Sequence, residues 1–385
     1  MEIKKWKSEN SFGYKHENSQ ILISFPEELD IECDSNDLIN INKKNNRKNL
    51  RNFFNVLYKK KTNLIKSNKL IHSSDHINNL FVSFEWIINA FLNNGIPKTF
   101  NYIFSNNLKN KINWKKTFDS GVYFINKKIV FNKIICKQKN KLDDMITYSF
   151  IKCFNIAIEN IGWLYNISKK IYIQDNVSND ILLCYLKKEL VKTYKIENIH
   201  MINHMINILD SKNNGLNENN SVTLLHNEFW NIYENLICKI FSNYKEINPH
   251  AKWKNIEGIE KDASNLRPDC IHKDKQNNIW IIDAKYYHSG DGYKGMPQTS
   301  DIQKQFIYGE WMKEYINKNN IDNINNIYLC FILPGKNINS IKHISTATME
   351  IFNNNIYAYQ IDLQKLINNE YNEISFEYLP IPVQF

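Results

Sequence analysis

The stretch that decides the fold is LRPDCIHKDKQNNIWIIDAKYY, residues Leu266–Tyr287. Within it, the apolar run Ile279–Ile282 leads directly into Asp283, Ala284 and Lys285. A short apolar segment that follows a polar turn is typical of a central strand. Because side chains on a strand alternate between its two faces, Asp283 and Lys285 are predicted to be neighbours on one face.

A second acid lies one hairpin upstream. Asp269 follows Pro268, and a strand at about residues 268–272 would pair antiparallel across the turn and bring Asp269 beside Asp283. Mg²⁺ takes oxygen ligands and keeps several waters, so two carboxylates next to a substrate phosphate can hold it. Lys285 could then orient or deprotonate the attacking water. The hairpin therefore predicts a Mg²⁺-dependent nuclease site, and the alternative is a solvated Asp-x-Lys ion pair without catalytic role.

These residues resemble the PD-(D/E)XK nuclease superfamily and, more narrowly, the LlaJI-type restriction endonucleases and the McrC nuclease subunits of McrBC-type systems. The resemblance spans roughly residues 75–335 and is carried by FWNIYENLICKIF (229–241), LRPD (266–269), IIDAKYY (281–287) and SDIQKQFIYGEWM (300–312). It implies that Asp269 and Asp283 bind the metal and that Glu234 assists them. It also implies that Lys285 serves the attacking water. Gln305 would approach DNA or hold Lys285 in place, or be an ordinary exposed helix residue.

The fold class that the resemblance implies is α/β, with a PD-(D/E)XK (restriction-endonuclease-like) domain built on a central mixed β-sheet flanked by helices. The implied function is a Mg²⁺-dependent, sequence-specific restriction endonuclease of double-stranded DNA, acting beside a cognate methyltransferase. Two alternatives stay open: an McrC-like nuclease subunit driven by an AAA+ partner, and a non-catalytic DNA-binding module. A homodimer is a further expectation, because two cuts in a duplex often require two subunits.

The composition is typical of a folded protein and is compatible with binding to a polyanion. The chain of 385 residues has a net charge of +9, from 49 Lys and Arg against 40 Asp and Glu. Lys and Asn are abundant throughout the chain, however, so the charge excess is weak support for DNA binding. The seven cysteines are scattered without a C-x-x-C pair, which indicates free thiols in a reducing compartment. With no apolar stretch of membrane-spanning length and no signal-peptide core, a bacterial cytoplasmic protein without a membrane partner is expected.

The polar stretch at about residues 211–221 predicts a linker between two domains. Residues 1–210 would form a mixed, mostly helical amino-terminal domain for DNA recognition, and residues 222–385 the nuclease domain. The predicted helices span about 75–93, 144–164, 181–194, 224–243 and 300–317, with a hairpin at 121–135 and strands at 327–333, 346–351 and 356–361.

Basic residues supply the remaining candidate contacts to DNA. The segment Lys43–Lys61 contains eight basic residues and no acid, and within it Arg47, Lys48 and Arg51 are candidates for phosphate contacts. The alternative is a solvated helix face whose aromatic residues point into a core. Lys294, in the Gly-rich loop after the candidate strand, is a further candidate phosphate contact.

Overall fold

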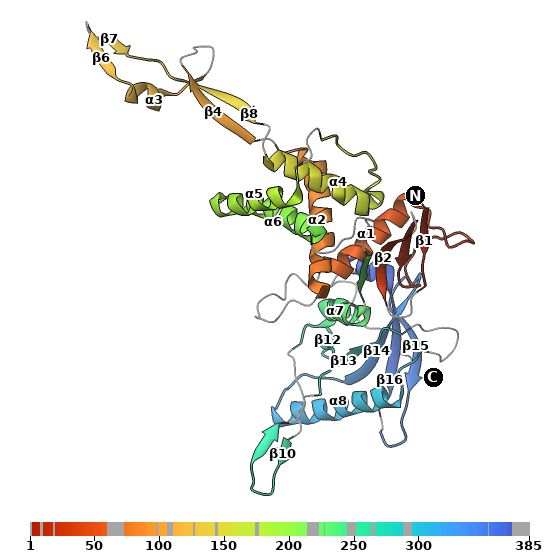
Figure 1. Ribbon diagram of the computed structural model, residues 1–385. Helices are drawn as coiled ribbons and strands as arrows, with labels where there is room; N and C mark the ends of the chain where they lie inside the picture. Colours follow the sequence, from red (N-terminus) through yellow and green to blue (C-terminus); the bar gives the residue numbers. More distant parts are fainter. Residues whose placement is uncertain are drawn as a thin grey trace. The chain divides into compact units, whose positions relative to one another are not determined.

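The computed structural model describes residues 2–7, 11–17, 20–59, 73–97, 99–105, 111–125, 128–142, 145–173, 177–213, 223–226, 228–244, 252–262, 266–287, 295–352 and 354–371. It is a mixed α/β protein (Figure 1). Contacts divide the chain into two units, one of Met1–Leu70 with Ser221–Phe385 and the other of Ile71–Asn220.

The boundary at residues 220/221 lies in the linker expected at residues 211–221, but residues 1–70, which the sequence assigns to the amino-terminal domain, group instead with the carboxy-terminal half. The first residues of the chain belong with the carboxy-terminal half because β9 (Thr223–His226) pairs antiparallel with β2 (Phe12–Glu17). β2 also pairs with β3 (Gln20–Ser24), which pairs with β1 (Glu2–Lys5), giving the order β1-β3-β2-β9. Residues 211–213 of the expected linker lie in helix α6 (Ile196–Asn213), and residues 214–222 are outside the described ranges.

Helix α1 (Lys44–Lys59) packs its aromatic face into this first unit. Phe53, Phe54 and Tyr58 are fully buried, and the Phe53 ring lies 5.8 Å from that of Phe229 in α7 (Phe229–Phe241). This burial agrees with the alternative in which the aromatic residues of the basic segment point into a core.

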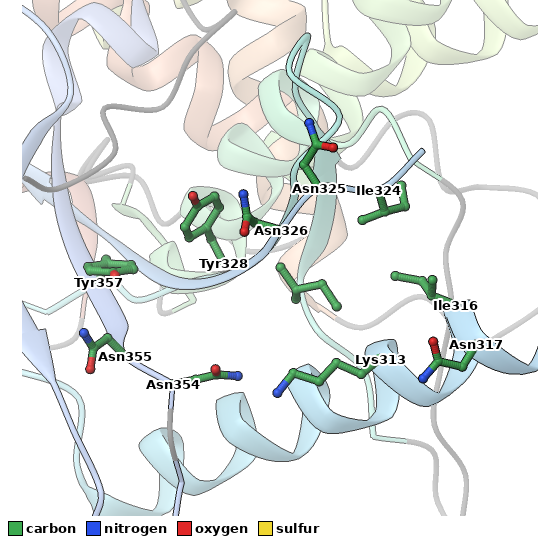
Figure 2. A pocket seen from close by; sticks show the side chains of 11 residues that line it. Lys313, Ile316, Asn317, Ile324, Asn325, Asn326, Tyr328, Asn354, Asn355 and Tyr357 are labelled. Atoms are coloured by element: carbon green, nitrogen blue, oxygen red, sulfur yellow. The ribbon is translucent and has the colours of Figure 1, made fainter. Parts of the chain in front are cut away.

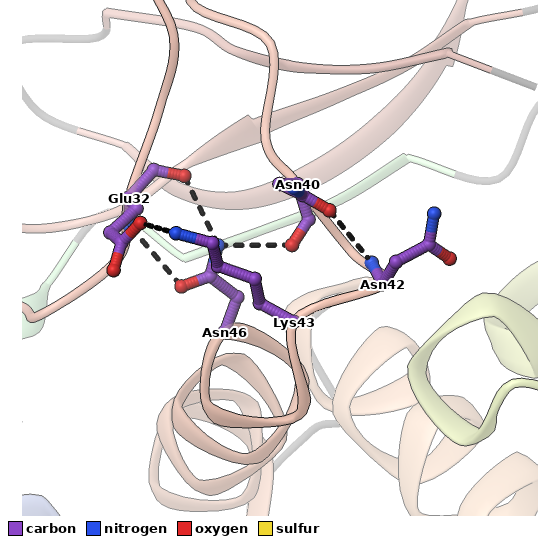
Figure 3. Close-up of polar contacts among 5 residues, drawn as sticks. All are labelled: Glu32, Asn40, Asn42, Lys43 and Asn46. Atoms are coloured by element: carbon purple, nitrogen blue, oxygen red, sulfur yellow. Dashed lines mark hydrogen bonds and ion pairs between the residues drawn. The ribbon is translucent and has the colours of Figure 1, made fainter.

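The start of α1 is fixed by polar contacts (Figure 3). The Asn46 amide donates to the carbonyls of Glu32 and Asn40, and its Oδ1 accepts from the Glu32 backbone N–H. Lys43 forms an ion pair with Glu32. Part of the basic segment therefore serves the fold itself.

The central sheet of the same unit is mixed, as predicted. Its order is β12-β13-β14-β16-β15, from β12 (Cys270–Lys273), β13 (Ile279–Ala284), β14 (Ile327–Gly335), β16 (Ile356–Asp362) and β15 (Lys342–Ala347). The three inner strands run parallel, and both edge strands run antiparallel to their neighbours. Every residue of β13 is buried, which explains its nearly continuous apolar sequence.

Helices cover both faces of this sheet. Helix α8 (Thr299–Lys318) packs Phe306, Tyr308 and Met312 against one face, where Ile281 and Phe331 complete the core. Helix α7 contacts β12 and β13, and Figure 1 shows α7 and α8 on opposite sides of the sheet. A short helix, α9 (Leu363–Ile367), follows β16, and a hairpin of β10 (Lys252–Lys254) and β11 (Glu260–Asp262) precedes β12. The sandwich of helices around a mixed sheet confirms the coarse α/β prediction.

The second unit is mostly helical, with long helices α2 (Ser73–Asn94), α4 (Met145–Tyr165), α5 (Asn179–Lys192) and α6. Helix α2 ends at Gly95, whose φ of +69° is a conformation that glycine adopts without strain. The unit also contains a sheet of β4 (Thr99–Ser105), β8 (Cys136–Leu142) and β5 (Lys111–Ile112) in that order, helix α3 (Trp114–Asp119), and a hairpin of β6 (Val122–Ile125) with β7 (Lys128–Phe131). The predicted helices at 75–93, 144–164 and 181–194 and the predicted hairpin are confirmed within a few residues. None of the helices in the described ranges has the length and apolarity needed to cross a bilayer.

Candidate active site

Two carboxylates face each other where β12 begins and β13 ends. Cys270 is paired with Ile282 in the antiparallel register, and this register places Asp269, one residue earlier, across from Asp283, one residue later. The backbone N–H of Ala284 donates to Asp269 Oδ2 at 2.7 Å. The hairpin therefore orients one carboxylate by a main-chain hydrogen bond and brings the second directly beside it.

Both covering helices hold the segment that carries Asp269. The Cys238 thiol of α7 donates to the Asp269 carbonyl at 3.2 Å. From α8, the Tyr308 hydroxyl donates to the Arg267 carbonyl at 3.0 Å. Asp269 is thus fixed by contacts from the sheet and from both layers of helix, which is the kind of rigid support that a functional carboxylate needs.

Lys285 lies beside the carboxylate pair although β13 ends at Ala284. Its backbone N–H still donates to the Ile332 carbonyl of β14 at 3.0 Å, so the extended geometry continues through this residue. Its Nζ is 2.9 Å from Asp283 Oδ2 and 3.5 Å from Asp301 Oδ1. The ammonium is therefore shared between one acid from the sheet and one from the first turn of α8.

Burial and crowding of like charges perturb the acids. Burial, together with the charges of Asp283 and Glu234, raises the pKa of Asp269 to about 8. Burial likewise raises the pKa of Glu234, with Asp283 adding to the effect and Lys285 opposing it. Burial also opposes the charge of Lys285, but the neighbouring carboxylates, Asp283 first, outweigh it and raise the pKa of its ammonium. Together with Asp301, four acids therefore lie near one lysine, an excess of acidic groups that a cation would compensate.

The donor set fits a hard divalent cation that keeps part of its water shell. Asp269 and Asp283 offer carboxylate oxygens from adjacent strands, and Glu234 lies close enough to shift the pKa of Asp269. Within the described ranges, no three His, Cys, Asp or Glu residues converge closely enough to hold a metal by themselves. The arrangement thus suits Mg²⁺ bound by two carboxylates with water and substrate oxygens, better than a closed protein cage.

The other predicted DNA contacts have different positions. Gln305 is fully buried and its Nε2 lies 3.4 Å from the Cys330 carbonyl, so it is neither exposed nor accessible to DNA. Among the described residues, its Oε1 has no hydrogen-bond partner. Arg47 donates to the Ile41 carbonyl at 2.7 Å, and Arg51 is half-buried, while Lys48 is exposed. Lys294 lies outside the described residues.

Asp301 belongs to the segment 300–312 that carries the family resemblance, but the sequence predicts no task for it in the site. It is an acid in the first turn of a helix, where a carboxylate usually stabilises the helix through its interaction with the helix dipole. Its approach to Lys285 depends on how α8 packs on the sheet, which no local pattern encodes. The Ala284 N–H donor to Asp269 was also not anticipated, because a backbone donor has no residue-type signal.

A pocket of about 530 Å³ lies at the other end of the same sheet (Figure 2). It is lined by residues of the carboxy-terminal half of α8 and of the amino-terminal ends of β14 and β16 with their preceding loops: Lys313, Ile316, Asn317, Ile324, Asn325, Asn326, Ile327, Tyr328, Asn354, Asn355 and Tyr357. Ile327 is in register with Ile279 at the start of β13, whereas Asp283 stands near the end of that strand. The pocket is therefore separate from the carboxylates.

One comparison with known proteins identifies the family of the chain. A search of curated protein sequences gave no significant match. Among solved structures, the chain is similar to a half-complex of Thermococcus gammatolerans McrB AAA+ hexamers with bound McrC, at a TM-score of 0.38 and 8% identity, over 94% of this chain and 83% of that one. Residues 14–365 match the family described as LlaJI restriction endonuclease, a span that includes both strands of the hairpin and both helices around it. The chain belongs to the LlaJI restriction endonuclease family.

Proposed function

We propose that this protein is a Mg²⁺-dependent restriction endonuclease of the PD-(D/E)XK type that hydrolyses phosphodiester bonds of double-stranded DNA at a specific sequence. The observation that carries the proposal is the facing pair Asp269 and Asp283, with the Lys285 ammonium 2.9 Å from Asp283. Membership of a restriction endonuclease family supports the same substrate class.

Each residue of the site has a distinct task in this mechanism. Asp269 and Asp283 would hold the cation, and the half-buried Glu234 would add negative charge beside them. When bound, Mg²⁺ would neutralise charge on the phosphate oxygens and lower the pKa of its water. Lys285 would orient the attacking water and stabilise negative charge that develops on the phosphate.

A plasmid cleavage assay with Mg²⁺ tests the proposal. We expect Asp283→Ala and Lys285→Ala each to lower cleavage by at least about 10²-fold while DNA binding, measured separately, changes little. Lys313→Ala, in the pocket at the far end of the sheet, is the matched control and should cleave like the wild type. Cleavage at the wild-type rate by Asp283→Ala would end the proposal.

Affinity for DNA is proposed to depend in part on the exposed face of α1. Lys48 is the exposed candidate there, whereas Arg47 is engaged with the Ile41 carbonyl. Charge reversal in Lys48→Glu should weaken binding uniformly across sequences and reduce the salt slope of log K by about one or more. An unchanged salt dependence of DNA binding in this variant would show that Lys48 does not contact a phosphate.

A second candidate function is that of an McrC-like nuclease subunit that needs a separate AAA+ partner. One observation favours it: the β6–β7 hairpin exposes large apolar side chains on both of its faces, with Tyr123, Ile125 and Val130 on one face and Phe124, which is 77% exposed, beside Ile129 on the other. Exposed apolar patches of this kind commonly mark protein interfaces.

The two candidates differ in what the purified chain can do alone. An autonomous enzyme cuts plasmid with Mg²⁺ and no nucleotide. A subunit of a nucleotide-dependent complex cuts only with GTP and its partner, and Phe124→Ser should then abolish the stimulation without unfolding the chain. Cleavage with Mg²⁺ alone at full rate would exclude the second candidate.

A further inference from the structure

The Lys285 ammonium has two carboxylate partners, and one of them is not among the proposed metal ligands. Its Nζ is 2.9 Å from Asp283 Oδ2 and 3.5 Å from Asp301 Oδ1. All three side chains are largely shielded, with exposed fractions of 20% for Lys285, 12% for Asp283 and 14% for Asp301. Ion pairs this deep matter more than surface pairs, because leaving either charge alone there is costly.

Asp301 is held in this position independently of Lys285. It lies in the first turn of α8, where the partial positive charge of the helix amino terminus favours a carboxylate. Its backbone N–H donates to the Gln298 carbonyl at 2.9 Å. Tyr287 lies nearby: burial, and after it the charge of the Asp301 carboxylate, raises the pKa of the Tyr287 hydroxyl. The position of Asp301 in the helix therefore does not depend on its ion pair with Lys285.

The pairing with Asp283 creates a conflict at the proposed site. An oxygen of Asp283 that accepts from the Lys285 ammonium is less available to a divalent cation, and the cation repels the ammonium. An ammonium released into a shielded site needs another anionic partner. Asp301 is the second carboxylate beside the same Nζ and can supply it without Lys285 leaving the site.

We propose that Asp301 is a positioning residue that takes up the Lys285 ammonium and thereby frees Asp283 for the divalent cation. This inference rests on the proposed function. It assigns to Asp301 no contact with the metal: its effect on metal affinity passes through Lys285. Without Asp301, the ammonium would pair fully with Asp283 and compete with the cation.

A double-mutant cycle on the full chain separates this role from direct metal ligation. The measurement is calorimetric titration of Mn²⁺, which takes the same oxygen ligands as Mg²⁺, into four proteins: wild type, Asp301→Asn, Lys285→Met and the double variant. We expect Asp301→Asn to weaken Mn²⁺ binding about tenfold in the wild-type background. In the Lys285→Met background the same change should alter affinity by less than about twofold, because the competing ammonium is gone.

Equal weakening in both backgrounds would overturn the proposal, since Asp301 would then act on the metal without Lys285. Unchanged affinity in Asp301→Asn would overturn it as well. Asp301→Glu, which keeps the charge, should restore binding to near the wild-type value, and thermal unfolding of each metal-free variant shows whether it is folded. If wild-type protein neither binds Mn²⁺ nor cleaves DNA, the proposed function itself fails. Normal wild-type binding with a failed cycle removes only the role of Asp301.

Discussion

The two ends of the central sheet are built from the same strands and differ in what they can do. Where β13 ends, Asp269, Asp283 and Lys285 are close together and shielded from water, and burial with neighbouring charge raises the pKa of Asp269 to about 8. Where β14 and β16 begin, a pocket of about 530 Å³ is lined mainly by asparagines, tyrosines and isoleucines. Among its described lining residues, Lys313 carries the charge, and it is already 2.7 Å from Glu310. Crowded, shielded charges are therefore a more specific sign of a functional site than a void of this volume.

Trp280 lies in β13 between the two ends of the sheet. It is fully buried, its indole N–H donates to Asp274 Oδ2 at 2.9 Å, and its ring stacks on Tyr328 at 4.4 Å. Tyr328 also lines the pocket, and the strand that continues from Trp280 delivers Asp283. The packing of this one side chain should therefore support both ends.

The largest effect is predicted for Trp280→Ala, which tests whether the two ends share one packed sheet. Removing a fully buried aromatic side chain should lower the free energy of unfolding by about 3–5 kcal/mol. The matched control is Trp253→Ala in β10, where the side chain is 73% exposed and the change should stay within about 0.5 kcal/mol. Urea denaturation measures both, and equal small losses would contradict the packing described for β13.

A second prediction uses the pH dependence of stability to distinguish the ends. The pKa of Asp269 is about 8 in the folded protein against an ordinary value of 3.8, so between these values the folded state binds a proton that the unfolded state has lost. The free energy of unfolding of the metal-free protein should thus decrease as pH rises from about 4 to 8 and level off above that. Asp269→Asn should flatten this slope, whereas Asn355→Ala in the pocket should keep it. If the stability of wild type and of Asp269→Asn varied identically with pH, the pKa of Asp269 would not be raised in the folded protein.

A third, smaller effect should follow from adding a divalent ion. If the carboxylate end binds Mg²⁺, a concentration tenfold above Kd should stabilise the wild type by about 1.4 kcal/mol, and removal with a chelator should reverse this. Asp283→Ala should lose the stabilisation, and Asn354→Ala in the pocket should retain it. Differential scanning calorimetry with and without Mg²⁺ makes the comparison. Stabilisation that persists in Asp283→Ala would place the ion elsewhere.

The sequence predicted the carboxylate end far better than the rest of the molecule. Strand alternation and one tight turn are local, so the pairing of Asp269 with Asp283 and the contact of Lys285 with Asp283 followed from spacing alone. The pairing of β2 with β9 joins residues separated by about half the chain, and no spacing rule reaches that far. For the same reason the sequence does not predict that residues 1–70 group with the carboxy-terminal half, although the observed boundary at residues 220/221 lies in the expected linker.

Helix packing explains the remaining errors. Gln305 and Asp301 occupy the same helix, and its pattern was compatible with either residue facing solvent. Only the docking of α8 on the sheet decides that Gln305 is buried under Cys330 and that Asp301 reaches Lys285. The pocket is also a product of that docking, since its lining comes from α8 and from loops before β14 and β16.

The smallest effect is predicted for the pocket itself. Asn355 is exposed at its rim, so Asn355→Ala should change the free energy of unfolding by no more than about 0.5 kcal/mol and leave DNA cleavage unchanged. The change removes an amide without disturbing a strand, because β16 begins only at Ile356. A loss of cleavage in this variant, with stability intact, would mean that substrate or a partner also occupies the asparagine end. The two ends would then belong to a single extended binding surface and differ only in their roles. Cleavage at Asp283 would depend on contacts made at the opposite end of the sheet.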